Sequence, residues 1–239
     1  SETQQIVAKV LKQKFNSINV KVRRIGGGFG GKETQSFLFA AISSIAAKKL
    51  NKPVKLRIDR DDDMIMTGKR HQFKFDYEVG FSNDGKINGL KILMASNCGI
   101  SADLSGAIND RAIYHIDNAY YIPNLELTSH RCKTNTVSNT AFRGFGGPQG
   151  MFCIENIIDH ISHHLNKDPA KIRAQNFYKI NTNNITHYGM KIEDNIIEEI
   201  FNNLKNKSKY IKRKKEIEKF NKSNSILKKG IAITPVKFG

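Results

Sequence analysis

The sequence is poor in the residues that build covalently braced or membrane-spanning proteins. Its three cysteines, Cys98, Cys132 and Cys153, are odd in number and widely spaced, which argues against a disulfide framework and favours a reducing compartment. No Cys-x-x-Cys pair occurs, so we do not expect this chain alone to hold an iron–sulfur cluster or a structural zinc ion. The longest apolar stretch, residues 37–47, falls short of the roughly 20 apolar residues that span a bilayer. We therefore expect neither a disulfide-rich nor a membrane-embedded protein.

Acidic residues are also scarce, since 22 Asp and Glu stand against 39 Lys and Arg and give a net charge of +17. The excess is uneven, because residues 201–239 carry twelve Lys and Arg against two Glu. Such basicity raises nucleic acid or an anionic membrane as partners. The Lys-rich stretch has no repeated aromatic interleaving, however, and its charge pattern favours a solvated helix or linker. We expect no nucleic-acid and no membrane partner.

Apolar residues make up 39% of the chain, enough for a hydrophobic core, and their periodicity predicts an α+β organisation. Alternation of apolar and polar residues indicates strands at 18–25, 53–60, 73–81, 87–95, 120–132 and 230–239, of which the third and fourth form a hairpin. Helical spacing indicates helices at 6–13, 34–50, 108–115, 151–165, 169–178 and 196–204. The helix that follows residue 150 carries an isoleucine stripe typical of a core-facing surface.

The run Gly-Gly-Gly-Phe-Gly-Gly at 26–31 lies between a predicted strand and a predicted helix. It satisfies the dinucleotide-binding spacing, but the acidic residue expected about twenty positions later is poorly matched, because Asp59 lies farther on. An anion-binding nest for a phosphate or a metal-oxo group fits the glycines equally well, and a tight turn is the plainer alternative. Because each glycine costs roughly 0.5–1 kcal/mol of chain entropy, and a turn needs only one or two, we favour a ligand site.

A second glycine-rich loop, Ala-Phe-Arg-Gly-Phe-Gly-Gly-Pro-Gln-Gly, occupies residues 141–150 at the start of another predicted helix. It places Arg143 between the rings of Phe142 and Phe145, so it can hold an anion and stack a flat ring. The two loops together predict a planar anionic ligand held from two sides. As alternatives, both Phe rings could be core anchors, and Glu33 could be a helix first-turn residue favoured by the macrodipole. Arg111, for its part, could belong to a surface ion pair.

The motifs GGGFGGKE at 26–33 and NTAFRGFGGPQG at 139–150 resemble the molybdenum cofactor-binding portion of the xanthine and aldehyde oxidase family of molybdenum hydroxylases. The resemblance continues through DRDDDMIMTGKRHQF, SADLSGAINDRA, HIDNAYYIPN and TPVKFG, and so covers essentially the whole chain. The form SADLSGAINDRA is most similar to the separate molybdopterin-binding subunit of bacterial enzymes. The resemblance implies an α+β cofactor-binding domain with a mixed sheet, packed helices and two glycine-rich strand-to-helix loops.

The resemblance also implies roles for individual residues. Contacts to the molybdenum–molybdopterin group, without side-chain metal ligation, fall on two sets, one in each loop: Gly27, Gly28, Phe29 and Gly30, and Phe142 and Arg143. The purine-binding residues of xanthine-type members correspond to Glu33, Arg111 and Phe145, where the ring of Phe145 stacks on the purine. Aldehyde-oxidising relatives typically lack the Glu and Arg pair, so its presence favours oxidation of hypoxanthine and xanthine to urate over aldehyde oxidation.

Other parts of such an enzyme are absent from this sequence. The family's general base is a Glu near the far end of the molybdenum-binding region, and a Gln that contacts the metal group precedes the segment matching Ser1, so no residue here is assigned either role. Electrons would leave through [2Fe–2S] centres and FAD to NAD on other domains or subunits, in a cytoplasmic hetero-oligomer or dimer.

The domain organisation expected from these considerations is that of an internal fragment. We expect a first cofactor-binding domain at 1–185, incomplete at its N-terminus, an Asn/Lys-rich connector at 186–229, and the first strand of a second cofactor-binding domain at 230–239. The fragment alone is expected to be inactive, and an inactive structural subunit remains an alternative.

Overall fold

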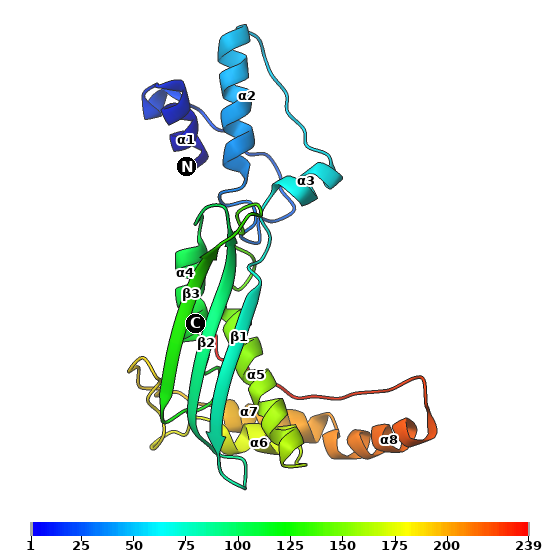
Figure 1. The fold of residues 1–239 in the computed structure, drawn as a ribbon. Helices are drawn as coiled ribbons and strands as arrows, with labels where there is room; N and C mark the ends of the chain where they lie inside the picture. Colours follow the sequence, from blue (N-terminus) through cyan, green and yellow to red (C-terminus); the bar gives the residue numbers. More distant parts are fainter. Residues whose placement is uncertain (1, 239) are drawn as a thin grey trace. The chain divides into compact units, whose positions relative to one another are not determined.

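A computed structural model describes residues 2–238 and has the α+β fold expected from the sequence (Figure 1). The chain forms two compact units. The first contains residues up to 74 together with 95–110 and 129–146, and the second contains 75–94, 111–128 and the chain from 147 onwards. The first glycine loop, 26–31, and residues 141–146 of the second belong to the first unit, whereas residues 147–150 belong to the second.

The three strands form one mixed sheet in the order β1-β2-β3 (Figure 1). Strands β1 (Phe73–Phe81) and β2 (Ile87–Gly99) are an antiparallel hairpin, whose turn contains Gly85 at a φ of 102°. Strand β3 (Leu125–Lys133) runs parallel to β2, because the amide of Leu90 donates to the carbonyl of Asn124 and that of Thr134 donates to Gly99. Helix α4 (Ser105–Tyr114) lies in the crossover between β2 and β3. The predicted hairpin and mixed sheet are thus confirmed.

The first unit holds α1 (Glu2–Leu11), the short 3₁₀ turn η1 (Phe15–Ser17), α2 (Ser36–Leu50) and α3 (Arg60–Met66). Helix α2 ends where predicted, at Asn51, which adopts the left-handed conformation common after helix ends. Helix α1 packs on α2, and Lys48 Nζ donates to the carbonyl of Leu11 at 2.9 Å. Helix α3 begins because the side chain of Asp59 accepts hydrogen bonds from the amides of Asp61 and Asp62.

Two predicted strands of the first unit, 18–25 and 53–60, are wrong. Among the described residues neither segment pairs with a strand, and Val22 and Ile25 are 72% and 61% exposed. Alternation shows which side chains share a face, but a strand also needs a neighbouring backbone to satisfy its amides and carbonyls. The prediction that both glycine loops join a strand to a helix therefore fails for the first loop, and thirteen residues of irregular chain, 134–146, separate β3 from the helix after the second.

The second unit has its core between β2 and α5 (Gly147–His164). The predicted isoleucine stripe is confirmed, since Ile154, Ile157, Ile158 and Ile161 are at most 1% exposed. The ring of Tyr77, on β1, stacks on His160 of α5. Helix α6 (Pro169–Asn176) starts as predicted, with Asp168 as its N-cap and Pro169 at its first position.

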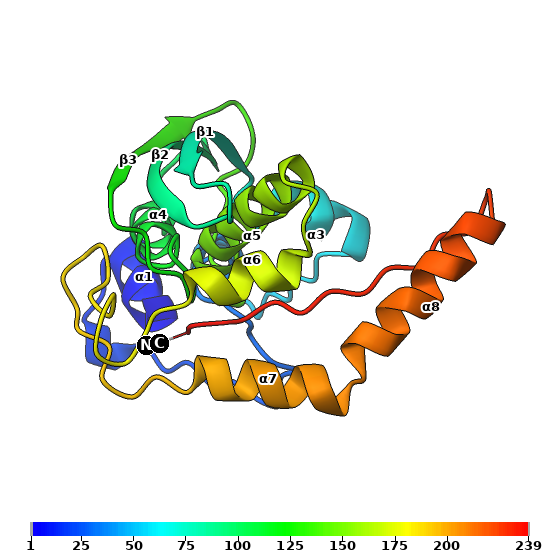
Figure 2. The ribbon, with the colours of Figure 1, turned by 90° about the horizontal axis from the view of Figure 1, so that it is seen from below.

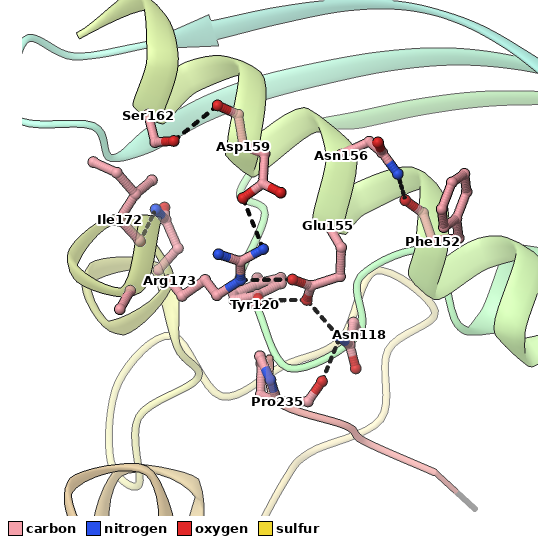
Figure 3. Close-up of polar contacts among 12 residues, drawn as sticks. Asn118, Tyr120, Phe152, Glu155, Asn156, Asp159, Ser162, Ile172, Arg173 and Pro235 are labelled. Atoms are coloured by element: carbon pink, nitrogen blue, oxygen red, sulfur yellow. Dashed lines mark hydrogen bonds and ion pairs between the residues drawn. The ribbon is translucent and has the colours of Figure 1, made fainter. Parts of the chain in front are cut away.

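A buried polar network joins α5 and α6 (Figure 3). The guanidinium of Arg173, whose side chain is 2% exposed, donates from Nε to Glu155 Oε2 at 2.6 Å and from Nη2 to Asp159 at 2.9 Å. The other oxygen of Glu155 accepts from the Tyr120 hydroxyl and from the side-chain Nδ2 of Asn118. Each polar group in this interior contact therefore has a partner.

The end of the chain follows α7 (Ile197–Lys207) and α8 (Tyr210–Ser223) and returns toward the start of α7 in an extended form (Figure 2). The predicted strand at 230–239 is wrong over the described residues 230–238, which form no strand because no neighbouring strand pairs with them, although Ile233 and Pro235 are buried. The side chain of Asn118 holds this segment by donating to the carbonyl of Pro235 at 2.9 Å and accepting from the amide of Lys237 at 3.0 Å. Across residues 2–238 no helix is both long and apolar enough to cross a membrane.

Candidate functional site

The first glycine loop has an unusual backbone, with three residues in the positive-φ region. Gly27, Phe29 and Gly30 have φ angles of 98°, 51° and 84°. Phenylalanine rarely adopts this left-handed conformation, which costs a residue with a Cβ roughly 1–2 kcal/mol. Its ring is nevertheless 56% exposed, so packing does not account for the conformation. Strained backbone of this kind is concentrated at functional sites.

The main-chain amides of this loop are open to a ligand. Within residues 2–238, the amides of Gly27, Gly28, Phe29 and Gly30 donate no hydrogen bond. A Cβ added to Gly28 would meet no atom within 4 Å, so that glycine leaves its surroundings open to close approach. Successive amides in such a curved backbone form a nest that attracts anions.

The second glycine loop repeats this backbone pattern. Gly144, Phe145 and Gly146 have φ angles of 94°, 48° and 98°, and the amide of Phe145 donates to the carbonyl of Phe142 at 2.8 Å. Phe142 is 46% exposed and Phe145 is half-buried. Phe142 is therefore not a core anchor. Each loop thus holds one phenylalanine in a conformation that suits glycine better, which indicates that the ring itself is needed there.

The two loops lie against each other within the first unit. A Cβ on Gly30 would lie 3.1 Å from the backbone carbon of Ala141, a tight contact, and a φ of 84° would strain any residue with a side chain, so both favour glycine here. The hydroxyls of Thr34 and Thr140 are 3.2 Å apart. The sequence prediction that both loops serve one site is supported by this contact.

A cavity of about 580 Å³ opens beside the loops. Residues of both loops line it together with α2 and the segment after α3: Gly28, Gly31, Lys32, Gln35, Ser36, Phe39, Asp63, Met64, Thr67, Gly68, Lys69, Arg70, Ala141 and Phe142. Three of these side chains are cationic and one is acidic, while the others are mostly apolar or small. The cavity is therefore suited to a ligand that is both flat and anionic.

Among the lining residues that the sequence analysis did not name as site residues, Arg70 makes the closest contacts with the second loop. Its Nη2 donates to the carbonyl of Arg143 at 2.7 Å, and its guanidinium carbon lies 4.6 Å from the centre of the Phe142 ring. Burial lowers the pKa of this guanidinium. Arg70 stands within the DRDDDMIMTGKRHQF stretch, but no local pattern there separates it from Lys69. Only the chain pairing of Arg70 with Thr140 brings it to the second loop.

The neighbouring His71 is buried, with Nε2 at 2.7 Å from the hydroxyl of Ser105. Burial lowers the pKa of His71, although a backbone hydrogen bond at Thr140 and the charge of Asp103 oppose the shift. This histidine is thus favoured in its neutral form at the base of the second loop.

The other residues predicted for the site do not line this cavity. Phe29, Glu33, Arg143 and Phe145 belong to the first unit but are not among the residues lining the described cavity. Glu33 is exposed and precedes α2, which begins at Ser36. It is therefore not a first-turn helix residue, contrary to the alternative drawn from the sequence.

Arg111 belongs to the second unit, where it is half-buried. Its guanidinium carbon lies 4.8 Å from the centre of the Phe238 ring, which also lies 5.5 Å from the ring of His115. A cation over an aromatic face at this distance is stabilised by the ring quadrupole. Arg111 is thus oriented by an aromatic contact that the sequence analysis did not foresee.

Comparison with known proteins identifies the family. Residues 1–177 match the family described as the molybdopterin cofactor-binding domain. This chain belongs to that family. Along its full length it is 43% identical to xanthine dehydrogenase of Calliphora vicina and 44% identical to that of Dictyostelium discoideum. Over 238 residues it is 44% identical to xanthine dehydrogenase/oxidase of Rattus norvegicus. The chain spans 18% of the length of each of these relatives.

Solved structures of oxidoreductases share the fold of this chain. Quinoline 2-oxidoreductase from Pseudomonas putida 86 matches 93% of the chain, with a TM-score of 0.80 at 19% identity, over 29% of its own length. Aldehyde oxidoreductase from Desulfovibrio gigas also matches 93%, with a TM-score of 0.78 at 24% identity, over 24% of its length. At these identities the likeness shows the fold and leaves the substrate open.

The residues present fit a molybdopterin cofactor. The open amides of the first loop suit anionic oxygens, and the exposed ring of Phe142 suits a flat ring system. A third sign is Arg70, whose Nη1 is buried without a hydrogen-bond partner among the described residues. A half-buried guanidinium with one buried, unpartnered nitrogen favours an anion nearby.

Proposed function

We propose that this chain is part of a molybdenum hydroxylase of the xanthine dehydrogenase type, which oxidises hypoxanthine and xanthine to urate. The observation that carries the proposal is the meeting of the two glycine loops beside one cationic, partly aromatic cavity. Whole-chain identity of 43–44% to xanthine dehydrogenases supports the purine substrate.

In this proposal the chain holds the cofactor from two sides. Gly28, Phe29 and Gly30 offer amides to its anionic oxygens, because a curved run of amides concentrates positive potential without a side chain. Phe142 and Arg143 contact it from the second loop, the guanidinium by charge and the ring by apolar contact. A bound molybdenum–molybdopterin group supplies the oxidative hydroxylation chemistry.

Three residues bind and orient the purine. The ring of Phe145 stacks on it, and the left-handed backbone of that residue fixes the direction in which the ring points. The carboxylate of Glu33 hydrogen-bonds a purine edge, and the guanidinium of Arg111 neutralises the charge that develops on an exocyclic oxygen. No general base is assigned to this chain.

The remaining machinery lies on other domains or subunits. We propose that [2Fe–2S] centres and FAD pass electrons to NAD in a cytoplasmic hetero-oligomer or dimer. The exposed apolar side chains of Leu38, Ile42 and Ile45 on α2 support a partner domain, since they lie at helical spacing on one face and are 47–53% exposed.

The proposed domain boundaries follow the sequence prediction, with a cofactor-binding domain at 1–185, a connector at 186–229 and a further domain from 230. As a fragment, the 239-residue chain should form no urate from xanthine, and measurable urate from it alone would contradict this assignment.

The substrate class is tested by Arg111→Met in the full-length enzyme, with steady-state kinetics on xanthine and on aldehydes. Loss of a charge that stabilises the transition state should lower kcat/KM for xanthine by about 10²–10³-fold, while aldehydes, which place no exocyclic oxygen there, lose much less. Equal losses on both substrates would refute the purine-specific role and favour an aldehyde-oxidising enzyme.

A further inference from the structure

Arg70 contacts the second glycine loop in two ways. Its main chain pairs with the start of the loop, and its guanidinium contacts Phe142 and Arg143. The main chain at Arg70 forms a parallel bridge with Thr140, and the amide of Thr140 donates to the carbonyl of Lys69 at 3.0 Å. The amide of Lys69 in turn donates to the side chain of Asn139 at 3.2 Å. The segment after α3 thus fixes the start of the loop.

The guanidinium of Arg70 fixes the next two residues. One face lies over the Phe142 ring, and Nη2 donates to the carbonyl of Arg143 at 2.7 Å. Both contacts need a planar group with donors at its edge, which arginine has and lysine lacks. Since Phe145 closes a turn by donating to the carbonyl of Phe142, holding Phe142 also determines where Phe145 lies.

The position of the Arg70 guanidinium lowers the stability of the fold when no ligand is bound. The residue is half-buried, its Nη1 is buried and has no hydrogen-bond partner among residues 2–238, and burial lowers the pKa of its guanidinium. A buried donor without a partner is destabilising and calls for an explanation. The guanidinium charge lies at the cavity that both loops line, where it raises the positive potential felt by an anion.

We propose that Arg70 is a positioning residue of the cofactor site: it holds Phe142 and the Arg143 peptide in place and contributes positive charge to the cavity beside them. This inference rests on the proposed function, because it assumes that the second loop holds the cofactor and the purine. It adds a residue that neither glycine motif contains.

The test uses the full-length enzyme with Arg70→Met, which removes charge and planarity, and Arg70→Lys, which removes planarity alone. Arg57, an exposed arginine of the same unit, provides the matched controls Arg57→Met and Arg57→Lys. Molybdenum and pterin content are measured beside flavin and iron content, and hydrogen exchange of the 139–147 peptide is measured in cofactor-free protein.

Arg70→Met should lower molybdenum and pterin content about 10-fold, with flavin and iron unchanged, and speed exchange of the 139–147 peptide about 10-fold, as loss of one charge-assisted hydrogen bond implies. Arg70→Lys should recover most of the cofactor content but keep fast exchange and a KM for xanthine raised several-fold with little change in kcat. Both Arg57 variants should match the wild type.

Several results would overturn the inference. Wild-type cofactor content and exchange in Arg70→Met would show that the loop does not depend on Arg70. Parallel loss of molybdenum, flavin and iron would show a general folding role. Failure of Arg70→Lys to recover any cofactor would refute the contribution of positive charge to cofactor binding. A wild-type enzyme without molybdenum and pterin refutes both the proposed function and this inference, whereas one that holds them but does not oxidise purines refutes the purine assignment alone.

Discussion

Glu155 is the residue whose removal should most sharply disturb the interior of the second unit. Its carboxylate accepts from Arg173 at 2.6 Å and from the Tyr120 hydroxyl at 2.5 Å, and its side chain is 14% exposed (Figure 3). Glu155→Leu leaves the guanidinium of Arg173, 2% exposed, with Asp159 as its remaining ion-pair partner among the described residues. Breaking a buried pair from one side costs about 3–5 kcal/mol.

Native-state hydrogen exchange of α5 and α6 in the full-length enzyme measures this loss. Since 1.4 kcal/mol is tenfold, exchange through local opening should accelerate by about 10²-fold to several 10³-fold. Two variants serve as controls. Asp159→Asn should change exchange little, because the Asp159 side chain is 55% exposed and such pairs contribute about 0–1 kcal/mol.

The double variant Glu155→Leu with Arg173→Met should recover most of the protection, because no buried charge is then left unpaired. Unchanged exchange in Glu155→Leu alone would refute the view that this ion pair stabilises the contact between α5 and α6.

Three further outcomes are expected. Gly30→Ala should reduce molybdenum content, measured by metal analysis, severalfold. The φ of 84° strains alanine, and its Cβ, 3.1 Å from Ala141, would push the loops apart. Normal molybdenum content would contradict a need for the contact between the loops. Phe238→Ala should raise the KM for xanthine severalfold, because it frees the guanidinium of Arg111. Phe238→Tyr keeps the ring and serves as the control. Equal KM values in the two variants would contradict a role of the Phe238 ring in orienting Arg111. Because burial depresses the pKa of His71 below 6.5, the unfolded state binds more protons than the folded state, and stability should fall as the pH drops below about 6.5. In pH-dependent thermal unfolding, His71→Gln should flatten this dependence of stability on pH. An unchanged pH dependence would exclude His71 as its source.

Local chemistry made several features readable from the sequence. The isoleucine stripe of α5, the Asp168-Pro169 start of α6 and the hairpin turn at Gly85 depend on residues within a few positions of one another, and all three are confirmed. The glycine loops were likewise recognisable, because clustered glycines around Phe and Arg have few structural uses.

Other features needed the tertiary structure. The segments 18–25 and 53–60 alternate like strands but lack a paired backbone, which no local pattern reveals. Arg70 becomes a site residue only because the chain after α3 lies beside Thr140, seventy residues further on. The guanidinium of Arg111 likewise contacts the ring of Phe238, a residue far from it in the sequence.

The sequence by itself therefore determined the family, the two loops and the kind of ligand they suit, since these follow from residue type and short-range spacing. The tertiary structure decided that the loops touch at Gly30, that Phe29 and Phe145 adopt a left-handed backbone, and that the half-buried Arg70 lines the cavity beside the second loop. Those facts depend on contacts between residues far apart in the chain, and packing, not local propensity, selects such contacts.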